Sequence, residues 1–181
     1  MFICTKDLKD EDYVNSHYVI MATKKGVVKK TSLEQYSRPR KGGINAIGVR
    51  EGDELLEAKM TTGSSQIIMG LKSGKAVRFE ESKTRPMGRN ASGVRGVTLA
   101  HENDEVIGMI SVNETTDNIL VVSQNGYGKR SDLEDYRVTN RGGKGVKTIS
   151  ITDKTGELVA IKNVTDQDDL MIINKSGIAI R

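Results

Sequence analysis

The stretch VVSQNGYGKR, residues 121–130, decides the fold of this chain, because its pattern recurs along the sequence. An apolar segment leads into a turn with glycine, and a segment that carries a basic residue follows, which is the pattern of a β-hairpin. The turn glycine recurs at spacings of 48, 52 and 51 residues, as Gly26, Gly74, Gly126 and Gly177. A basic residue stands four positions after each of these glycines. The fixed period indicates one structural unit that is used several times.

Each repeat is predicted to contain four short strands. The first is the apolar segment, at residues 19–22, 67–70, 119–122 and 170–173. The second follows the turn, and the pair Asn125-Gly126 favours a type I′ turn because both residues tolerate a positive φ. The third is expected at 93–99 and 145–151, and the fourth at 55–60, 106–112 and 158–164. Single helical turns are expected at 32–36 and 131–136, and no long helix is predicted.

Four strands in about 50 residues is the size of a propeller-type blade, so the sequence predicts an all-β repeat array. Three blades are expected at approximately 19–66, 67–118 and 119–169. Partial blades are expected at 1–14, with a strand over residues 1–7, and at 170–181. Because natural arrays have capped ends, these incomplete ends predict that the chain is a piece of a larger array.

The charges are segregated along the repeat. The formal net charge is only +4, but the windows 26–50, 74–98 and 126–150 together hold 18 basic and six acidic residues. The remaining residues hold 10 basic and 18 acidic side chains. A basic stripe beside an acidic remainder indicates a polyanionic partner on one face of the molecule.

The loops after the second strands are rich in arginine and glycine, which suits phosphate binding because glycine lets the backbone approach and arginine supplies charge. We expect Gly43, Gly88 and Gly143 to shape these loops. Contacts mainly with phosphates are expected from a larger set: Lys29, Lys30, Arg38, Arg40, Lys41, Arg78, Arg85, Arg89, Arg95, Lys129, Arg130, Arg141, Lys144 and Lys147.

Aromatic residues make up only 4% of the chain. We expect Tyr36, Phe79, Tyr127 and Tyr136 to pack in the core or between blades. Binding of single strands requires a series of stacking platforms, so the basic track favours the backbone of a duplex as its partner.

No catalytic or metal site is predicted. His17 and His101 stand in unrelated sequence contexts, without the neighbours that a nucleophile or a metal ion requires. Cys4 is the only cysteine, so no disulfide forms within the chain and a reducing compartment is expected. No apolar run reaches the ~18 residues of a membrane span, and no signal peptide is visible.

Several stretches resemble the C-terminal domain of the DNA gyrase A family. These stretches are residues 21–31, 77–79, 85–96 and 121–130, and the likeness extends over essentially the whole chain. The resemblance implies a β-pinwheel, in which propeller-like four-stranded blades exchange strands and a basic rim wraps duplex DNA. It further implies a cytoplasmic, nucleoid-associated protein without membrane contact.

The resemblance also implies which chemistry lies elsewhere. The domain is non-catalytic in isolation and binds no cofactor, while the holoenzyme uses ATP and magnesium outside it to introduce negative supercoils. The implied partners are duplex DNA, the remainder of the gyrase A polypeptide, and the B subunit. Residues 141–145 match the last five positions of the family's box, Gln-Arg-Arg-Gly-Gly-Lys-Gly, which belongs to the first blade. The order of the loops aligns this segment with a late blade, so the chain is expected to contain the later blades.

Three alternatives remain open from the sequence. The first is the C-terminal domain of a topoisomerase IV A-type subunit, which supercoiling by the complete subunit would distinguish from gyrase. The second is a protein-interaction propeller whose charges only keep it soluble. The third is an enzyme, which the lack of an acid–base or metal cluster disfavours. DNA binding separates the topoisomerase domains from the last two.

Overall fold

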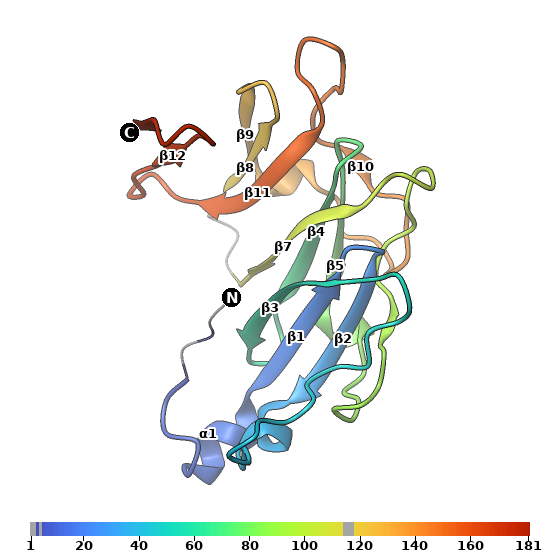
Figure 1. The fold of residues 1–181 in the computed structure, drawn as a ribbon, viewed down its shortest axis with the longest axis vertical. Helices are drawn as coiled ribbons and strands as arrows, with labels where there is room; N and C mark the ends of the chain where they lie inside the picture. The colour runs from blue at the N-terminus through green and yellow to red at the C-terminus, as the bar shows by residue number, and fades with distance from the viewer. Residues whose placement is uncertain (1–2, 4, 114–117) are drawn as a thin grey trace.

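The recurring segments fold into four hairpins. The computed structural model describes residues 3, 5–113 and 118–181, and in it the sheets follow one another along the long axis of the molecule (Figure 1). The first and second strands of the repeats are confirmed: β1 (Tyr18–Thr23) with β2 (Val27–Ser32), β4 (Gln66–Leu71) with β5 (Lys75–Glu80), β8 (Asn118–Ser123) with β9 (Gly128–Asp132), and β12 (Ile172–Ile173) with β13 (Ala179–Ile180).

The hairpin turns depend on the glycine, but the predicted type I′ geometry is wrong. The amide of Gly126 donates to the carbonyl of Ser123 at 3.0 Å, and the amide of Ser123 donates to the carbonyl of Tyr127 at 2.8 Å. Asn125 lacks the positive φ that a type I′ turn requires, whereas Gly126 has a φ of 84°. The turn is therefore a three-residue loop that ends in a left-handed glycine, a common hairpin geometry.

The fourth strands are confirmed and lie beside the first strand of their own repeat. They are β3 (Leu55–Thr61), β7 (Val106–Val112) and β11 (Leu158–Val164), which pair with β1, β4 and β8 respectively.

The third strands are much shorter than predicted. Only β6 (Val94–Arg95) and β10 (Val146–Lys147) form, because the chain beyond β6 turns onto the first hairpin, where the amides of Gly96 and Val97 both donate to the carbonyl of Gly26.

Each third strand joins the sheet of the preceding repeat. β6 pairs with β2 and β10 pairs with β5, so the sheet orders are β3-β1-β2-β6 and β10-β5-β4-β7. The third repeat forms the sheet β11-β8-β9. This exchange of strands is the one that a β-pinwheel requires. The blade boundaries at 19–66, 67–118 and 119–169 stay predictions. β6 completes the sheet of the first range and β10 that of the second, although each strand lies in the range that follows.

The apolar strands β1 and β4 are buried on both faces. In β1, Ile20 and Ala22 pack in the core between the first two sheets, while Val19 and Met21 pack on the opposite face. A second core lies between the second and third sheets, where Ile68 meets residues of β8 and β11. Because side chains alternate between faces along a strand, these strands are apolar at nearly every position.

Short helices cover the ends of the sheets. The sequence patterns did not predict α1 (Glu11–Ser16), whose first turn is capped by the Asp10 carboxylate accepting from the Tyr13 amide at 3.1 Å. α1 packs Val14 against the outer face of the first sheet. The strand expected over 1–7 falls partly on residues outside the described ones, and Ile3 and residues 5–7 form no strand.

Single helical turns follow the second strand of each repeat. The two predicted turns are confirmed as η1 (Leu33–Tyr36) and η3 (Leu133–Asp135), and a third, η2 (Glu81–Lys83), occupies the same position in the second repeat. No helix in the part of the chain that the structure describes is long and apolar enough to cross a membrane.

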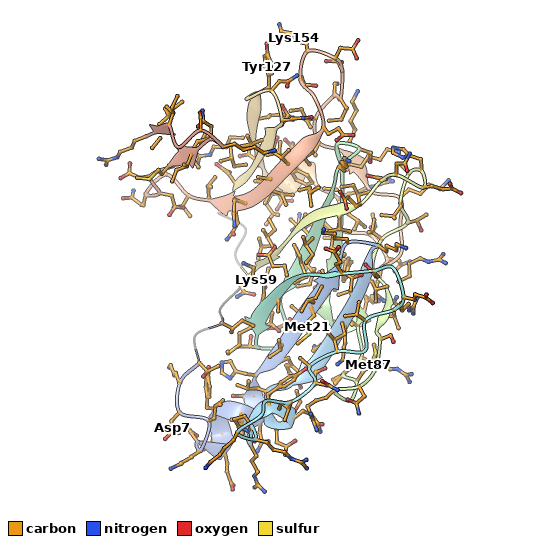
Figure 2. The ribbon with its side chains drawn as sticks, in the orientation of Figure 1. Asp7, Met21, Lys59, Met87, Tyr127 and Lys154 are labelled. Carbon is orange, nitrogen blue, oxygen red and sulfur yellow. The ribbon has the colours of Figure 1, made fainter. Side chains whose placement is uncertain are left out.

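The sheet order separates two edges of the molecule. β7 contacts both β3 and β11, so the sheets converge at this edge. The exchanged strands β6 and β10 lie at the opposite edge of their sheets. Lys59 of β3 and Met87 of the loop after β5 accordingly lie on opposite sides (Figure 2). The arginine-rich loops therefore follow the edge opposite to the convergence, which we call the outer edge.

Replacing the turn glycines by alanine separates backbone strain from steric collision. Gly74 and Gly126 have φ values of 79° and 84°, but a Cβ on Gly74 would lie 2.6 Å from the Ile149 carbonyl oxygen, while one on Gly126 meets nothing within 4 Å. We expect Gly126→Ala to lower the free energy of unfolding by about 1–2 kcal/mol and Gly74→Ala by about 3 kcal/mol or more. Urea unfolding of the two variants measures this. Equal losses would contradict the packing of the third repeat on the second hairpin.

Candidate nucleic-acid interface

The exchanged strands place cations at equivalent positions of the outer edge. Arg95 in β6 and Lys147 in β10 are both exposed. Lys147 lies directly opposite Lys75 in the register of β10 and β5. Like charges that face each other across a strand pair are destabilising. Among the described residues neither lysine has an ion pair, so this part of the edge keeps uncompensated positive charge that suits an anion.

A second group of cations surrounds Arg95. Lys25, Arg50 and Arg95 line a hollow of about 350 Å³, and Thr98 lies among them. The Arg50 guanidinium donates to the carbonyl of Gly93 at 3.4 Å. None of the three cations has a carboxylate within ion-pair distance in the described part of the chain. The predicted set omitted Lys25, Arg50 and Lys75, although Arg50 and Lys75 lie in the basic windows of the sequence.

Nine of the fourteen predicted residues are exposed, and eight of these have side chains without a hydrogen bond or ion pair within the described residues. The eight come from the loops after β2, β5 and β9 and from the strands β6, β9 and β10. They are Arg38, Arg40, Lys41, Arg85, Arg95, Lys129, Lys144 and Lys147. Their charge is directed to solvent and is available to a ligand.

Lys30, by contrast, is buried, so its prediction as a phosphate contact is wrong. Its Nζ lies 3.0 Å from Oε1 of Glu81, which is itself fully buried, and 4.3 Å from the ring centroid of Tyr18. Glu81 also accepts from the hydroxyl of Thr61 at 2.6 Å. The ammonium thus joins the first hairpin to the helical turn η2 of the next repeat.

Arg78 occupies the same position in the second repeat and is also buried, so it too is wrongly predicted. Its Nη1 donates to the carbonyls of Leu133 at 2.7 Å and Tyr136 at 2.9 Å, at η3. Its Nε donates to Oε1 of Gln66 at 2.7 Å. The guanidinium binds carbonyls at the start of the helical turn and just after it, which fixes the third repeat on the second.

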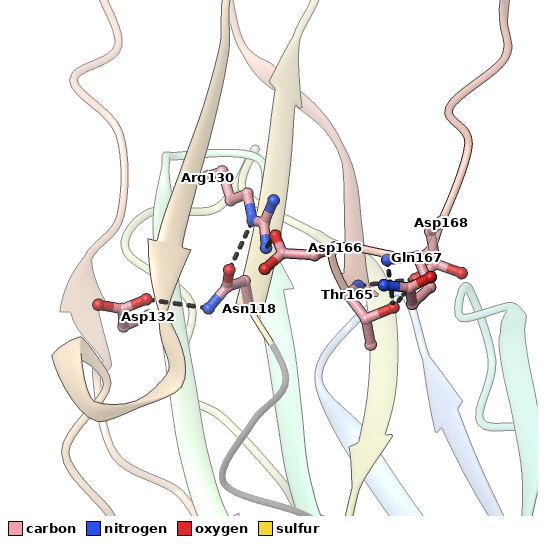
Figure 3. Close-up of polar contacts among 7 residues, drawn as sticks. All are labelled: Asn118, Arg130, Asp132, Thr165, Asp166, Gln167 and Asp168. Carbon is pink, nitrogen blue, oxygen red and sulfur yellow. Dashed lines mark hydrogen bonds and ion pairs between the residues drawn. The ribbon is translucent and has the colours of Figure 1, made fainter.

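Arg130 is the third copy of this position and is exposed. Its Nε donates to Oδ1 of Asn118, and its Nη2 forms an ion pair with Asp166, both at 2.5 Å (Figure 3). The recurring basic residue therefore has a shared role in the first three repeats, where it joins its own hairpin to a following segment.

Lys29 is the third buried residue of the predicted set, and its prediction as a phosphate contact is wrong as well. Its Nζ donates to the carbonyl of Ala46 at 2.6 Å and to that of Arg89. Burial, with a smaller contribution from the Arg89 charge, lowers the pKa of Lys29 to about 8.

Arg89 and Arg141 hold neighbouring loops together. Nη1 of Arg89 donates to the carbonyl of Asn45 at 3.3 Å. Arg141 donates to the carbonyl of Arg95 through Nη1 and to that of Lys83 at 3.3 Å through Nε. Both side chains are half-buried at equivalent positions of their loops. Each of them connects its loop to the preceding repeat.

Only one of the three glycines that are predicted to shape the loops has a backbone conformation that favours glycine. Gly43 has a φ of 79°, but Gly88 and Gly143 lie outside the left-handed region. The requirement falls on Gly142, with a φ of 86°, and on Gly145, where a Cβ would lie 2.6 Å from the carbonyl oxygen of Ala76. Gly145 lets the chain enter β10 against β5.

Among the aromatic residues, Phe79 and Tyr136 are buried and Tyr36 is half-buried against the core, as predicted. Tyr127 is 42% exposed, and the prediction that it packs is wrong. The Nζ of Lys154 lies 5.4 Å from its ring centroid (Figure 2). The described residues contain no group of three His, Cys, Asp or Glu side chains that could hold a metal ion.

Comparisons with known proteins agree with this architecture. A family profile described as the DNA gyrase C-terminal domain, beta-propeller, matches residues 17–61, 72–113 and 117–165. The DNA gyrase A subunit of Staphylococcus aureus (strain MRSA252) is 46% identical over 180 residues, which are 99% of this chain. The chain spans about a fifth of the length of that relative, 20%.

Two solved structures share the fold. The crystal structure of the C-terminal domain of DNA topoisomerase IV superposes with a TM-score of 0.85 at 23% identity, over 91% of this chain and 51% of that one. The structure of the DNA gyrase A C-terminal domain superposes with a TM-score of 0.81 at 26% identity, over 92% of this chain and 55% of that one.

The buried and exposed lysines of the predicted set differ in their effect on stability. Lys30→Met leaves Glu81 buried without its counter-charge, so we expect the free energy of unfolding to fall by about 3–5 kcal/mol. Lys41→Met removes an exposed cation and serves as the control, with an expected change within about 0.5 kcal/mol. Thermal or urea unfolding of both variants measures the difference. A Lys30→Met variant as stable as Lys41→Met would mean that Lys30 does not join the repeats.

Proposed function

The chain belongs to the DNA gyrase C-terminal domain family, and on this premise we propose that its outer edge binds duplex DNA and bends it around successive blades. One observation carries the proposal. Exposed cations that have no partner within the described residues recur at equivalent positions of successive repeats, on the edge opposite to the convergence of β3, β7 and β11. A duplex that follows this edge meets one basic group after another.

The chemistry of the edge suits phosphates rather than bases. Its ligand groups are lysine ammonium and arginine guanidinium groups, which bind phosphate oxygens without reading the sequence. Bending a duplex over 20–30 base pairs costs on the order of 1–6 kcal/mol. Contacts spread over several blades offset this cost, and a single blade does not. We therefore expect affinity to depend on the length of the duplex more than on its sequence.

The remaining roles belong to the same proposal and are supported by the membership of the family. In the complete gyrase A polypeptide the domain wraps DNA so that the holoenzyme, with its B subunit, introduces negative supercoils in the bacterial cytoplasm, where the enzyme associates with the nucleoid. The domain itself is non-catalytic and binds no cofactor, since ATP and magnesium act elsewhere in the holoenzyme.

A topoisomerase IV A-type subunit is the second candidate, favoured by the TM-score of 0.85. That likeness concerns the fold, whereas the 46% identity to a gyrase A polypeptide extends over 99% of the chain and favours gyrase. A protein-interaction propeller is disfavoured by the facing lysines Lys75 and Lys147, because charges that only maintain solubility need not be placed against each other.

Binding to duplexes of increasing length at several salt concentrations tests the proposal. We expect affinity to rise until the duplex spans the outer edge and then to level off, with a steep fall as salt increases. Weak binding that is independent of length and salt would contradict the proposal and would favour a protein partner.

Lys147→Gln separates a binding role from a structural one. Removing one of two facing like charges is expected to raise the free energy of unfolding by about 0.2–1 kcal/mol at low salt. The same change should weaken DNA binding and reduce the salt slope by about 1.

Lys59→Gln is the matched control, because Lys59 lies on β3 at the convergent edge and is paired with Glu57 at 2.8 Å. We expect it to leave DNA affinity unchanged. Equal effects of the two variants on binding would show that DNA does not follow the outer edge.

A further inference from the structure

We propose that Lys29 is a positioning residue, whose buried ammonium holds the basic loop 37–50 of the first repeat against the basic loop 84–93 of the second at the spacing that one duplex requires. The inference rests on the proposed function, because it concerns how the outer edge is arranged for DNA. Lys29 itself contacts no phosphate, since its side chain is fully buried.

The geometry of Lys29 connects two segments that are distant in sequence. Lys29 extends from β2, opposite Met21 of β1, and its Nζ ends between the two loops. It donates to the carbonyl of Ala46 in the first loop at 2.6 Å and to the carbonyl of Arg89 in the second. One cation thus satisfies a backbone carbonyl from each loop, and displacing either loop breaks a charge-assisted hydrogen bond.

The other contacts between the loops are few and peripheral. The amide of Gly48 donates to the carbonyl of Ala91 at 3.2 Å, Nη1 of Arg89 donates to the carbonyl of Asn45 at 3.3 Å, and the Arg50 guanidinium donates to the carbonyl of Gly93 at 3.4 Å. No β-ladder joins residues 37–50 to residues 84–93. The bonds of Lys29 are shorter than these contacts and come from a fully buried side chain. The second loop is also held on β2, where the amide of Met87 donates to the carbonyl of Lys30 at 2.8 Å, so Lys29 is the buried connection from that loop to the first one.

Comparison with the second repeat shows that a buried strand does not need a lysine at this position. The register that places Lys29 opposite Met21 places Val77 opposite Met69 in the second repeat. Val77 is buried in the apolar core. A buried cation without a carboxylate partner is costly, and a valine at this position fills the same kind of site without that cost. The lysine is explained by the carbonyls that it binds.

The two loops carry exposed cations of the proposed interface. Arg38, Arg40 and Lys41 lie in the first loop and Arg85 in the second. A rigid duplex engages both groups only when their separation matches its phosphates. Misplacing one loop therefore costs affinity for a duplex that crosses both loops, and costs little for a duplex that meets only one of them.

The pH dependence provides a second signature. With a pKa of about 8, Lys29 loses its proton between pH 7 and 9, and its bonds to the two carbonyls become weaker neutral ones. Two other groups face it: the Arg89 guanidinium from the second loop, and the Tyr36 hydroxyl from η1, which donates to the same Ala46 carbonyl at 2.9 Å. Burial raises the pKa of Tyr36 above its ordinary value, so Tyr36 stays neutral over this range.

The test compares Lys29→Met with Lys41→Met in the whole chain, on a short duplex of about 10 base pairs, or one helical turn, and on a long one that crosses both loops. We expect Lys29→Met to weaken binding of the long duplex by about tenfold, because it removes two charge-assisted bonds, and to leave the salt slope unchanged. Lys41→Met should instead reduce the slope by about 1. A slope that falls equally in both variants, or a Lys29→Met variant that binds like the wild type, overturns the proposal.

Two further measurements keep the result interpretable. In Lys29→Met, hydrogen exchange of the Gly48 amide should become faster while the core amides of β1 and β4 stay protected. Faster exchange in the core as well would assign the loss to unfolding and overturn a positioning role.

The wild type should lose affinity for the long duplex between pH 7 and 9, and a flat profile would overturn the proposal even if the variant failed to fold. If the wild type shows no salt-dependent DNA binding, the proposed function fails, whereas the exchange of Gly48 still tests the connection of the loops.

Discussion

The first two sheets of this protein each have two apolar faces, and burying both of them requires a neighbour on either side. In β4, Ile67 and Met69 enter the core shared with the first sheet, whereas Ile68 enters the core shared with the third. A sheet of four short strands does not bury these residues alone, so the repeats stabilise one another as in other repeat proteins. α1 takes the place of a neighbour on the outer face of the first sheet.

The exchange of strands extends this dependence to the backbone. β6 and β10 complete the sheets of the preceding repeats, so hydrogen bonds as well as apolar packing cross between repeats. Polar side chains reinforce the same junctions. Lys30 reaches Glu81 and Arg78 reaches η3, and both connections are buried where water does not compete for them. At these junctions, apolar side chains thus supply the buried area, and the polar contacts determine which groups meet.

The charges of the chain divide into two classes with different physical roles. Lys29, Lys30 and Arg78 are turned inward and satisfy buried acceptors, while Arg95, Lys147 and the exposed loop cations face solvent on the outer edge. Two solved structures with this fold come from different topoisomerases, so the fold alone does not specify the activity. The outward class carries the proposed binding of DNA, and the inward class arranges the surface on which it lies.

Much of the architecture was predictable because it depends on local patterns. The apolar strands, the turn glycines and the regular period determined the hairpins and the all-β array, since glycine at a positive φ and alternating burial are properties of neighbouring residues. Local patterns were misleading where two conformations compete: Asn125-Gly126 suggested a type I′ turn, and the third strands ended early, at Arg95 and at Lys147. α1 was missed although Asp10 provides its cap. The sequence by itself also determined that cations accumulate once per repeat. Only the tertiary structure decided which of them face inward, because that depends on acceptors such as Glu81 and Leu133, which lie about one repeat further along the chain and come close only when the blades stack.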